Sequence, residues 1–260
     1  MKFTILIYGI LSYLIGVTGL VSLIACFTGY APFGFLWGTV TLELNPWLWN
    51  SVLIGLWGVI HSVTARPAYK RVLTKIIPES AERPTYVLLA GITSVLLVGY
   101  WQPLSGHIWQ IQSDIIANAV IALALFGWTF LLASTFAINH FDLFGLRQVY
   151  LNFKGQERPP LEFTERMMYR VIRHPIQTGV LIGIWATPSM SMTQLLLSLG
   201  FTAYIAVGLW FEERDLIAEH GADYLAYRQR TGAVLPGLRS RSAAHRLTGP
   251  EQLSGFSPRD

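Results

Sequence analysis

The amino-acid sequence predicts an all-α membrane protein: a polytopic transmembrane helical bundle of five to six membrane helices, followed by a C-terminal amphipathic helix. Three observations predict this fold class. Of the 260 residues, 52% are hydrophobic and only 13% are charged, whereas soluble domains carry roughly 25% charged residues. The charged residues cluster and leave charge-free runs at 3–42, 44–65, 84–113, 115–141 and 174–211. Each run can supply at least one crossing, which needs roughly 20 apolar residues.

The boundaries of the predicted helices follow from turn signals inside these runs. The first run is broken at Gly29-Tyr30-Ala31-Pro32 and the last at Thr187-Pro188-Ser189, where proline and glycine end helices. We therefore expect helices at about 3–28, 46–62, 85–102, 115–138, 175–187 and 191–211. The fifth is short and either spans the membrane or only dips into it. The segment 31–45 is aromatic without a helical period and is expected to be re-entrant or interfacial.

The basic residues predict the orientation. All 19 Lys and Arg residues fall at the N-terminus, in 62–84, in 139–173 or from 212 onward, and the intervening loops hold none. Because cytoplasmic loops carry the excess of Lys and Arg, we expect six crossings with both termini in the cytoplasm. The pI near 9.3 therefore indicates a lipid bilayer as the partner, not nucleic acid.

The chain is expected to form a single integral membrane domain over 1–237, with a disordered basic tail at 238–260. The tail is rich in Ser, Gly, Pro and Arg, a composition that does not build a core. Cys26 is the only cysteine, and it is expected to be a small buried hydrophobe. No metal-ligand spacing is present, so no metal is expected.

Polar side chains follow the fourth predicted helix in the stretch NHFDLFGLRQVY. Asn139, His140 and Asp142 lie at the membrane surface, with Arg147 a few residues later. One interpretation is helix capping and interfacial anchoring. The other is a catalytic base with a carboxylate that orients it, because histidine moves protons near neutral pH. An i, i+2 pair does not share a helix face, so His140 and Asp142 meet only where the backbone turns.

A second polar group is predicted where the last two membrane helices meet the cytoplasm. Arg173, His174 and Pro175 begin one helix, Gly179 follows within it, and Glu212-Glu213 end the other. Because the two helices are antiparallel, these residues should be neighbours. The carboxylates either form an ion pair with an arginine or bind a ligand. The amphipathic segment 214–230, which Gly221 can break, is expected to hold Tyr224, Tyr227 and Arg228 over the cytoplasmic end of these two helices.

These motifs resemble the C-terminal signature of the isoprenylcysteine carboxyl methyltransferase superfamily, which includes phospholipid methyltransferases. Its marks are Arg-His-Pro, a glycine soon after, a double glutamate and Tyr-x-x-Tyr-Arg, within residues 164–236. The stretches HSVTARPAYKR, ERPTYVLLA, INHFDLFGLRQVY and WATPSMS look like the bacterial methanethiol S-methyltransferases, over most of residues 55–236. One departure is Gln177, where the superfamily usually has tyrosine. The ending AVLPG is a loose version of the group's usual close.

The resemblance implies S-adenosyl-L-methionine as the cofactor and methanethiol as the acceptor, which becomes dimethyl sulfide. The residues implied for cofactor binding are Arg173, His174, Pro175, Gln177, Gly179, Glu212, Glu213, Tyr224, Tyr227 and Arg228. A carboxylate suits the ammonium or the ribose diol, an arginine the carboxylate, and a tyrosine the adenine.

The attacking sulfur must be a thiolate, so a proton has to leave. His140, held by Asp142 or Asn139, is the predicted base, with Arg147 stabilising the thiolate. His61, Arg66, Arg83 and Tyr86 either line the acceptor pocket or anchor the helices at the interface. Two alternatives remain open: a methyltransferase for a prenylcysteine carboxylate or lipid amine, and a non-catalytic membrane protein that retains the scaffold.

Overall fold

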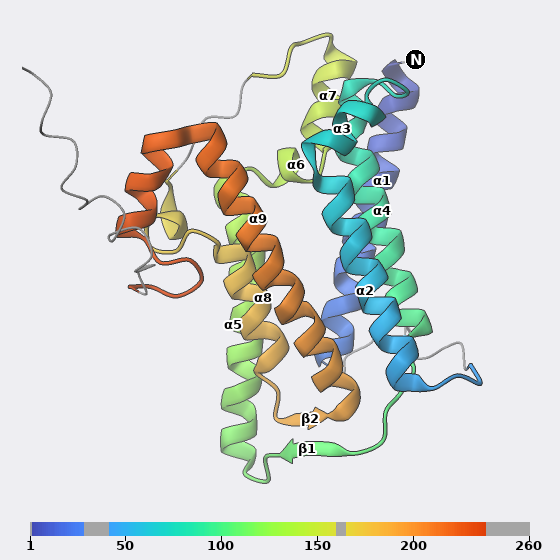
Figure 1. Ribbon diagram of the computed structural model, residues 1–260, viewed down its shortest axis with the longest axis vertical. Helices are drawn as coiled ribbons and strands as arrows, with labels where there is room; N and C mark the ends of the chain where they lie inside the picture. Colours follow the sequence, from blue (N-terminus) through green and yellow to red (C-terminus); the bar gives the residue numbers. More distant parts are fainter. Residues whose placement is uncertain (1, 29–41, 160–164, 238–260) are drawn as a thin grey trace, which may run out of the picture.

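Helices make up most of the computed structural model, which describes residues 2–28, 42–159 and 165–237 (Figure 1). The helices are α1 (Lys2–Thr28), α2 (Pro46–Ala65), α3 (Pro67–Leu73), α4 (Glu79–Tyr100), α5 (Asp114–Ile138), α6 (His140–Leu143), α7 (Leu146–Lys154), the 3₁₀ turn η1 (Met167–Arg170), α8 (Pro175–Trp185) and α9 (Met192–Arg230). Two short strands, β1 (His107–Gln110) and β2 (Ser189–Ser191), pair antiparallel.

The predicted all-α polytopic bundle is confirmed. Among the described residues, five helices are long and apolar enough to cross a membrane: α1, α2, α4, α5 and α9. The fifth predicted helix is the short α8, whose 11 residues extend about 16 Å. Because a bilayer core is about 30 Å thick, α8 is too short to cross by itself. Most of the expected re-entrant segment 31–45, and the whole tail 238–260, lie outside the described residues.

Local sequence signals explain where several helices begin and end. Asn45 caps α2 by accepting hydrogen bonds from the backbone N–H of Trp47 and Leu48 at 3.0 and 3.2 Å, and α2 ends just before Pro67, as proline requires. Helix α4 begins at Glu79, earlier than the predicted 85, and contains Pro84. The acidic first turn favours this earlier start, because carboxylates stabilise helix N-termini.

The C-terminal region differs from the prediction at one point. Two separate helices were expected, ending and beginning around Glu212-Glu213, but α9 continues through these residues without a break. The interruption falls at Gly221, whose φ of 53° and ψ of −122° are non-helical and suit glycine. Glu212 and Glu213 therefore project from consecutive positions of one continuous helix, toward different neighbours.

The helices form two groups (Figure 1). Helices α1, α2, α4 and α7 pack together on one side, and α5, α8 and α9 on the other. Close backbone approaches join the main pairs: a Cβ on Gly19 would lie 2.7 Å from Gly91 of α4, and one on Gly179 would lie 2.6 Å from the backbone of Leu131 in α5. Small residues permit such contacts between membrane helices.

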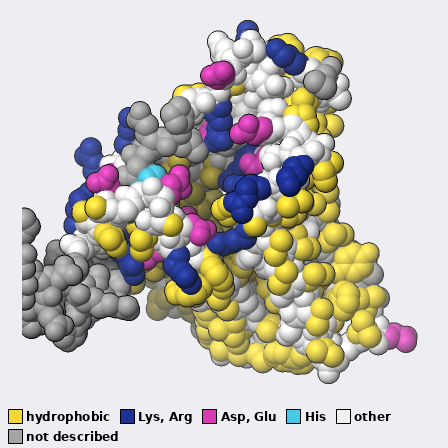
Figure 2. All heavy atoms as spheres, turned by 45° about the horizontal axis from the view of Figure 1, so that its top comes forward, with side chains coloured by type: hydrophobic (Ala, Val, Ile, Leu, Met, Phe, Trp, Pro, Cys, Tyr) yellow, Lys and Arg dark blue, Asp and Glu magenta, His cyan; other side chains and the backbone are white. Residues whose placement is uncertain are grey.

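One end of the bundle carries most of the polar residues. This polar end comprises the start of α1, the short helices α3, α6 and α7, and the last part of α9, whereas β1 and β2 close the opposite end (Figure 1). The four predicted basic segments that fall within the described residues therefore meet at one end. Figure 2 shows their Lys, Arg, Asp and Glu side chains around a hollow, with apolar side chains covering the flanks.

Candidate active site

A cavity of about 650 Å³ extends from the polar end into the bundle between the two groups of helices (Figure 2). Seven α-helices contribute to its wall, α1, α2, α4, α5, α6, α8 and α9, together with the 3₁₀ turn η1. Along α9 the lining runs from Phe201 to Glu219, about 27 Å at 1.5 Å per residue. Small-molecule sites usually measure roughly 300–1,000 Å³, so the cavity can hold a cofactor together with a small acceptor.

The start of α8 forms part of the cavity wall and is fixed by the chain that follows α9. The backbone N–H groups of Arg173 and His174 donate to the carbonyl oxygens of Gly232 and Ala233 at 2.9 and 3.0 Å. Thr178 Oγ1 donates to Val234 O at 2.8 Å. The AVLPG close singled out in the sequence thus anchors the Arg-His-Pro motif to the end of the domain.

Arg173 and Glu213 form a buried ion pair beneath this wall. The guanidinium donates to Glu213 Oε1 from Nε at 2.8 Å and from Nη2 at 2.5 Å, and its Nη1 donates to the carbonyl oxygens of Arg228 and Thr231. The two side chains are only 2% and 14% exposed. Arg228 lies 3.2 Å from the other Glu213 oxygen. All three nitrogens of Arg173 are therefore occupied by protein partners.

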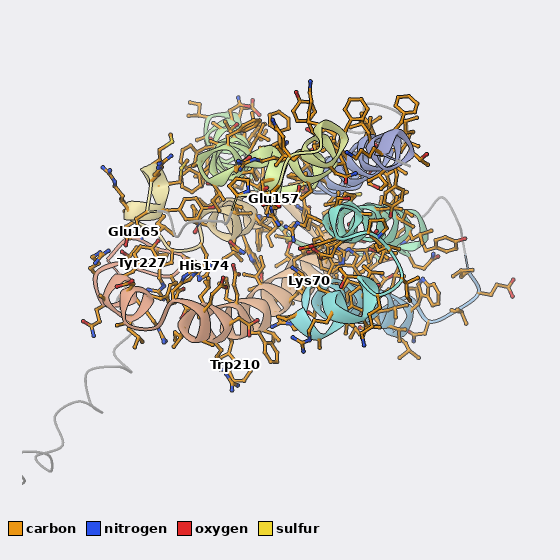
Figure 3. The ribbon with its side chains drawn as sticks, turned by 90° about the horizontal axis from the view of Figure 1, so that it is seen from above. Lys70, Glu157, Glu165, His174, Trp210 and Tyr227 are labelled. Carbon is orange, nitrogen blue, oxygen red and sulfur yellow. The ribbon has the colours of Figure 1, made fainter. Side chains whose placement is uncertain are left out.

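Glu212 differs from its neighbour because it lines the cavity. Its side chain is 49% exposed, and its Oε2 lies 3.8 Å from His174 Nδ1, while His174 Nε2 lies 3.3 Å from Glu213. Seen from the polar end, the labelled His174 lies between α9 and the helices across the cavity, and Trp210 points away from the bundle (Figure 3). Of the two predicted carboxylates, the structure places Glu212 at the cavity and Glu213 in the ion pair.

All four residues predicted for the acceptor pocket line this cavity: His61, Arg66, Arg83 and Tyr86. Arg66 forms an ion pair with Asp215 across the mouth, at 2.8 Å, and packs over the Phe211 ring. Arg83 donates from Nε to Leu143 O at 2.6 Å and lies 4.7 Å from the Tyr86 ring. The mouth therefore carries charges of both signs.

Aromatic side chains form the deeper part of the cavity. Trp57 lies 4.7 Å from Phe201 and 4.9 Å from Tyr204, measured between ring centroids, and Phe27 lies 6.2 Å from Trp128. Trp57 Nε1 donates to Ser94 Oγ at 3.1 Å. The cavity thus passes from a charged mouth to an apolar, aromatic interior. Faces of such rings attract cations, sulfonium groups included.

The predicted pairing of His140 with Asp142 is wrong. His140 Nδ1 lies 2.9 Å from Thr135 Oγ1, and its Nε2 lies 3.0 Å from the Tyr13 hydroxyl. Asp142 accepts instead from Arg158 at 2.6 Å. Asn139 caps α6 by accepting from the backbone N–H of Asp142, which matches the capping interpretation.

None of these residues, nor the half-buried Arg147 of α7, is among those that line the cavity. Burial lowers the pKa of His140 below its usual 6.5.

Five residues predicted to contact the cofactor lie behind the wall instead of on it. Pro175 is the buried first residue of α8, and Gly179 packs against α5. Tyr224 and Tyr227 are buried, and the Tyr227 hydroxyl donates to the carbonyl oxygen of Tyr169 in η1. Arg228 contacts Glu213. These residues support the site from outside, because they lie on faces of α8 and α9 that pack against other parts of the protein instead of facing the cavity. Gln177 does line the cavity.

Several lining residues were not predicted from the sequence: Trp57, Trp128, Tyr169, Phe201, Tyr204, Asp215 and Glu219. The acidic spacing of Glu212, Asp215 and Glu219 at i, i+3 and i+7 would have indicated one helix face, had α9 been recognised as continuous. Among the described residues, no group of three or more His, Cys, Asp or Glu side chains could hold a metal ion.

The fold and the cavity together define an integral membrane protein with a cavity of small-molecule size at one end. The chain belongs to a known family: the model described as NnrU protein matches residues 51–243, which include most of α2 and all of α3 through α9. No solved structure matches the chain.

Relatives with named activities extend over most of the chain. Methanethiol S-methyltransferase 2 of Bradyrhizobium diazoefficiens is 41% identical over 92% of this chain and 93% of its own length. Methanethiol S-methyltransferase of Mycobacterium tuberculosis is 46% identical over 72% and 77%. Nurim of Rattus norvegicus is 26% identical over 65% and 67%. The first two relatives support methyltransferase function for this chain.

Proposed function

We propose that the protein transfers a methyl group from S-adenosyl-L-methionine to a small thiol, converting methanethiol to dimethyl sulfide, at the cytoplasmic face of the bacterial inner membrane. The observation that carries this proposal is the combination of named relatives with a cavity that has a charged mouth and an aromatic interior. The domain responsible is residues 1–237.

The mouth of the cavity fits the polar parts of S-adenosyl-L-methionine. Glu212 can accept hydrogen bonds from its ammonium or its ribose diol, with His174 beside it. Arg66 and Arg83 supply positive charge for its carboxylate. Arg173, which the sequence suggested for cofactor binding, has a different role here. Its nitrogens already donate to Glu213 and to two carbonyl oxygens, so it holds the cavity wall in place. When bound, the cofactor supplies an electrophilic methyl group on a sulfonium.

The interior fits a small apolar acceptor. The ring centroid of Trp57 lies 4.7 Å from that of Phe201 and 4.9 Å from that of Tyr204, so the space beside these rings is apolar and excludes bulk water. A dry environment favours a reaction in which an anionic nucleophile and a cationic donor give neutral products. Methanethiol is small and apolar and suits this part of the cavity.

The basic segments suggest the orientation of the molecule. Lys and Arg residues gather at the polar end, which by the positive-inside pattern faces the cytoplasm. The mouth of the cavity would then receive a water-soluble cofactor from the cytosol, and methanethiol can reach it from water or lipid.

Purified protein in detergent provides the test. Calorimetry should detect binding of S-adenosyl-L-methionine, and gas chromatography of the headspace should detect dimethyl sulfide only when protein, cofactor and methanethiol are all present. Binding without product would move the acceptor to a prenylcysteine or a lipid amine. The absence of both binding and product would contradict the proposal and would favour a non-catalytic membrane protein.

A further inference from the structure

Three buried histidines lie toward the polar end among the described residues, and their ring nitrogens have different partners. Both nitrogens of His140 contact hydroxyl groups, those of Thr135 and Tyr13. Both nitrogens of His174 face carboxylates, at 3.3 Å from Glu213 and 3.8 Å from Glu212. Each nitrogen of these two rings therefore already has a protein group against it.

The third histidine, His61, is held through one nitrogen only. Its Nδ1 lies 3.0 Å from the carbonyl oxygen of Trp57, one helical turn earlier in α2. A carbonyl oxygen can only accept, so Nδ1 carries the hydrogen and Nε2 of the neutral ring carries the lone pair. No hydrogen bond joins Nε2 to another described residue, and it is not among the enclosed polar atoms that lack a partner. The ring is 8% exposed and lines the cavity.

The surroundings of His61 suit a thiol. The Trp57 ring lies against the imidazole at a centroid distance of 3.9 Å, and the rings of Tyr86 and Tyr204 lie at 6.4 and 6.3 Å from opposite helices. These aromatic groups fix the imidazole plane and keep bulk water away. His61 also lies five residues before Arg66, which is at the mouth, and therefore between the charged and the aromatic parts of the cavity.

We propose that Nε2 of His61 accepts the proton of the thiol as methyl transfer proceeds, which makes His61 the catalytic base. This inference rests on the proposed function and adds the proton acceptor to it. The S–H bond breaks, and its electron pair stays on the sulfur and forms the new bond to the methyl carbon. The bond between that carbon and the donor sulfur breaks, and its pair remains on the donor sulfur. The proton leaves Nε2 for water at the mouth.

Two acceptors of nearly the same shape test the base directly. Methanethiol is largely protonated at neutral pH, whereas methaneselenol, generated by reducing dimethyl diselenide, is largely ionised and needs no base. His61→Gln should lower turnover of methanethiol by roughly 100-fold or more, the usual contribution of a general base. Turnover of methaneselenol should fall far less. The ratio of dimethyl selenide to dimethyl sulfide should therefore rise by about 100-fold.

His140→Gln is the matched control, because His140 is also buried and is the histidine that the sequence suggested as the base. Its product ratio should equal that of the wild type. An equal loss of both products in His61→Gln would overturn the proposal in favour of a structural role. A raised ratio in His140→Gln would assign the base to His140. A wild-type protein that methylates neither acceptor would contradict the proposed function itself.

Nitrogen NMR of the wild-type protein, labelled with ¹⁵N-histidine, gives a readout that does not depend on turnover. We expect His61 to show a protonated Nδ1 and an unprotonated Nε2 at neutral pH, with His61→Gln used only to assign the signals. A protonated Nε2 would overturn the proposal. Calorimetry of cofactor binding should give the same affinity for wild type and His61→Gln.

Discussion

The wall of the cavity and the stretch 139–158 that follows α5, called the turn below, lie at the same end of the bundle, and both contain a histidine, a carboxylate and an arginine. In the turn, both ring nitrogens of His140 contact hydroxyl groups and Asp142 Oδ2 accepts from Arg158, away from the residues that line the cavity. In the cavity wall, Glu212 and one nitrogen of His61 face open space. Residue types alone therefore do not distinguish a catalytic group from a structural one. What distinguishes them is whether a polar atom remains available beside a cavity.

The most severe test of this comparison is to fill the cavity. A Cβ added to Gly208, which lines the cavity on α9, would meet no atom within 4 Å. Gly208→Phe should therefore be accommodated by the fold and should abolish both cofactor binding and turnover, because the ring occupies the space that the ligands need. Calorimetry and headspace chromatography measure the two effects.

Gly55→Phe provides the control for this substitution. Gly55 lies on the exposed face of α2, where an added Cβ also meets nothing within 4 Å, and both variants increase the apolar volume of a membrane helix equally. Gly55→Phe should keep the binding and turnover of the wild type. Retained cofactor affinity in Gly208→Phe would show that the ligands bind elsewhere.

The second test separates the two adjacent glutamates by stability. Glu213→Gln leaves the nearly buried Arg173 without its counter-ion. Loss of one partner from a buried ion pair typically costs about 3–5 kcal/mol, so the variant should unfold at a clearly lower temperature in detergent. Glu212→Gln should melt close to the wild type, since its carboxylate is half exposed. Equal melting temperatures for both variants would contradict the assignment of Glu213 to a structural pair.

For ligand binding, in contrast to stability, Glu212→Gln is the variant that we expect to be affected directly. Glu212→Gln should weaken binding of S-adenosyl-L-methionine by about tenfold, which corresponds to about 1.4 kcal/mol for one charge-assisted hydrogen bond near the surface. Calorimetry below the melting temperature measures this affinity. If Glu212→Gln binds the cofactor as tightly as the wild type, the carboxylate does not contact the ligand.

The smallest expected effect concerns the turn. Burial lowers the pKa of His140, so as pH falls below its usual 6.5 the unfolded chain takes up a proton that the folded protein does not. Stability from this residue is therefore present above that pH and decreases below it. The melting temperature should fall between about pH 7.5 and about pH 5.5, and by less in His140→Phe. An identical fall in that variant would show that other groups cause it.

The sequence predicted the membrane helices well, because hydrophobic length and the distribution of Lys and Arg are local properties of the chain. It also predicted that Arg173-His174 and Glu212-Glu213 would be neighbours, since two antiparallel helices bring their ends together. The continuation of α9 to Gly221 was missed, because charged residues after an apolar run look like the end of a helix. Which nitrogen of His61 carries the hydrogen depends on the rotamer of its side chain. The different roles of Glu212 and Glu213 depend on how α9 is rotated about its axis. Neither is encoded in residue spacing.

The central claim is that this cavity moves a methyl group from S-adenosyl-L-methionine to a thiol. Its most direct test supplies cofactor with a trideuterated methyl group, together with methanethiol, and analyses the headspace by gas chromatography and mass spectrometry. The account predicts dimethyl sulfide with one intact CD₃ group in the wild type and none in Gly208→Phe. Unlabelled product, or no product from protein that binds the cofactor, would contradict it.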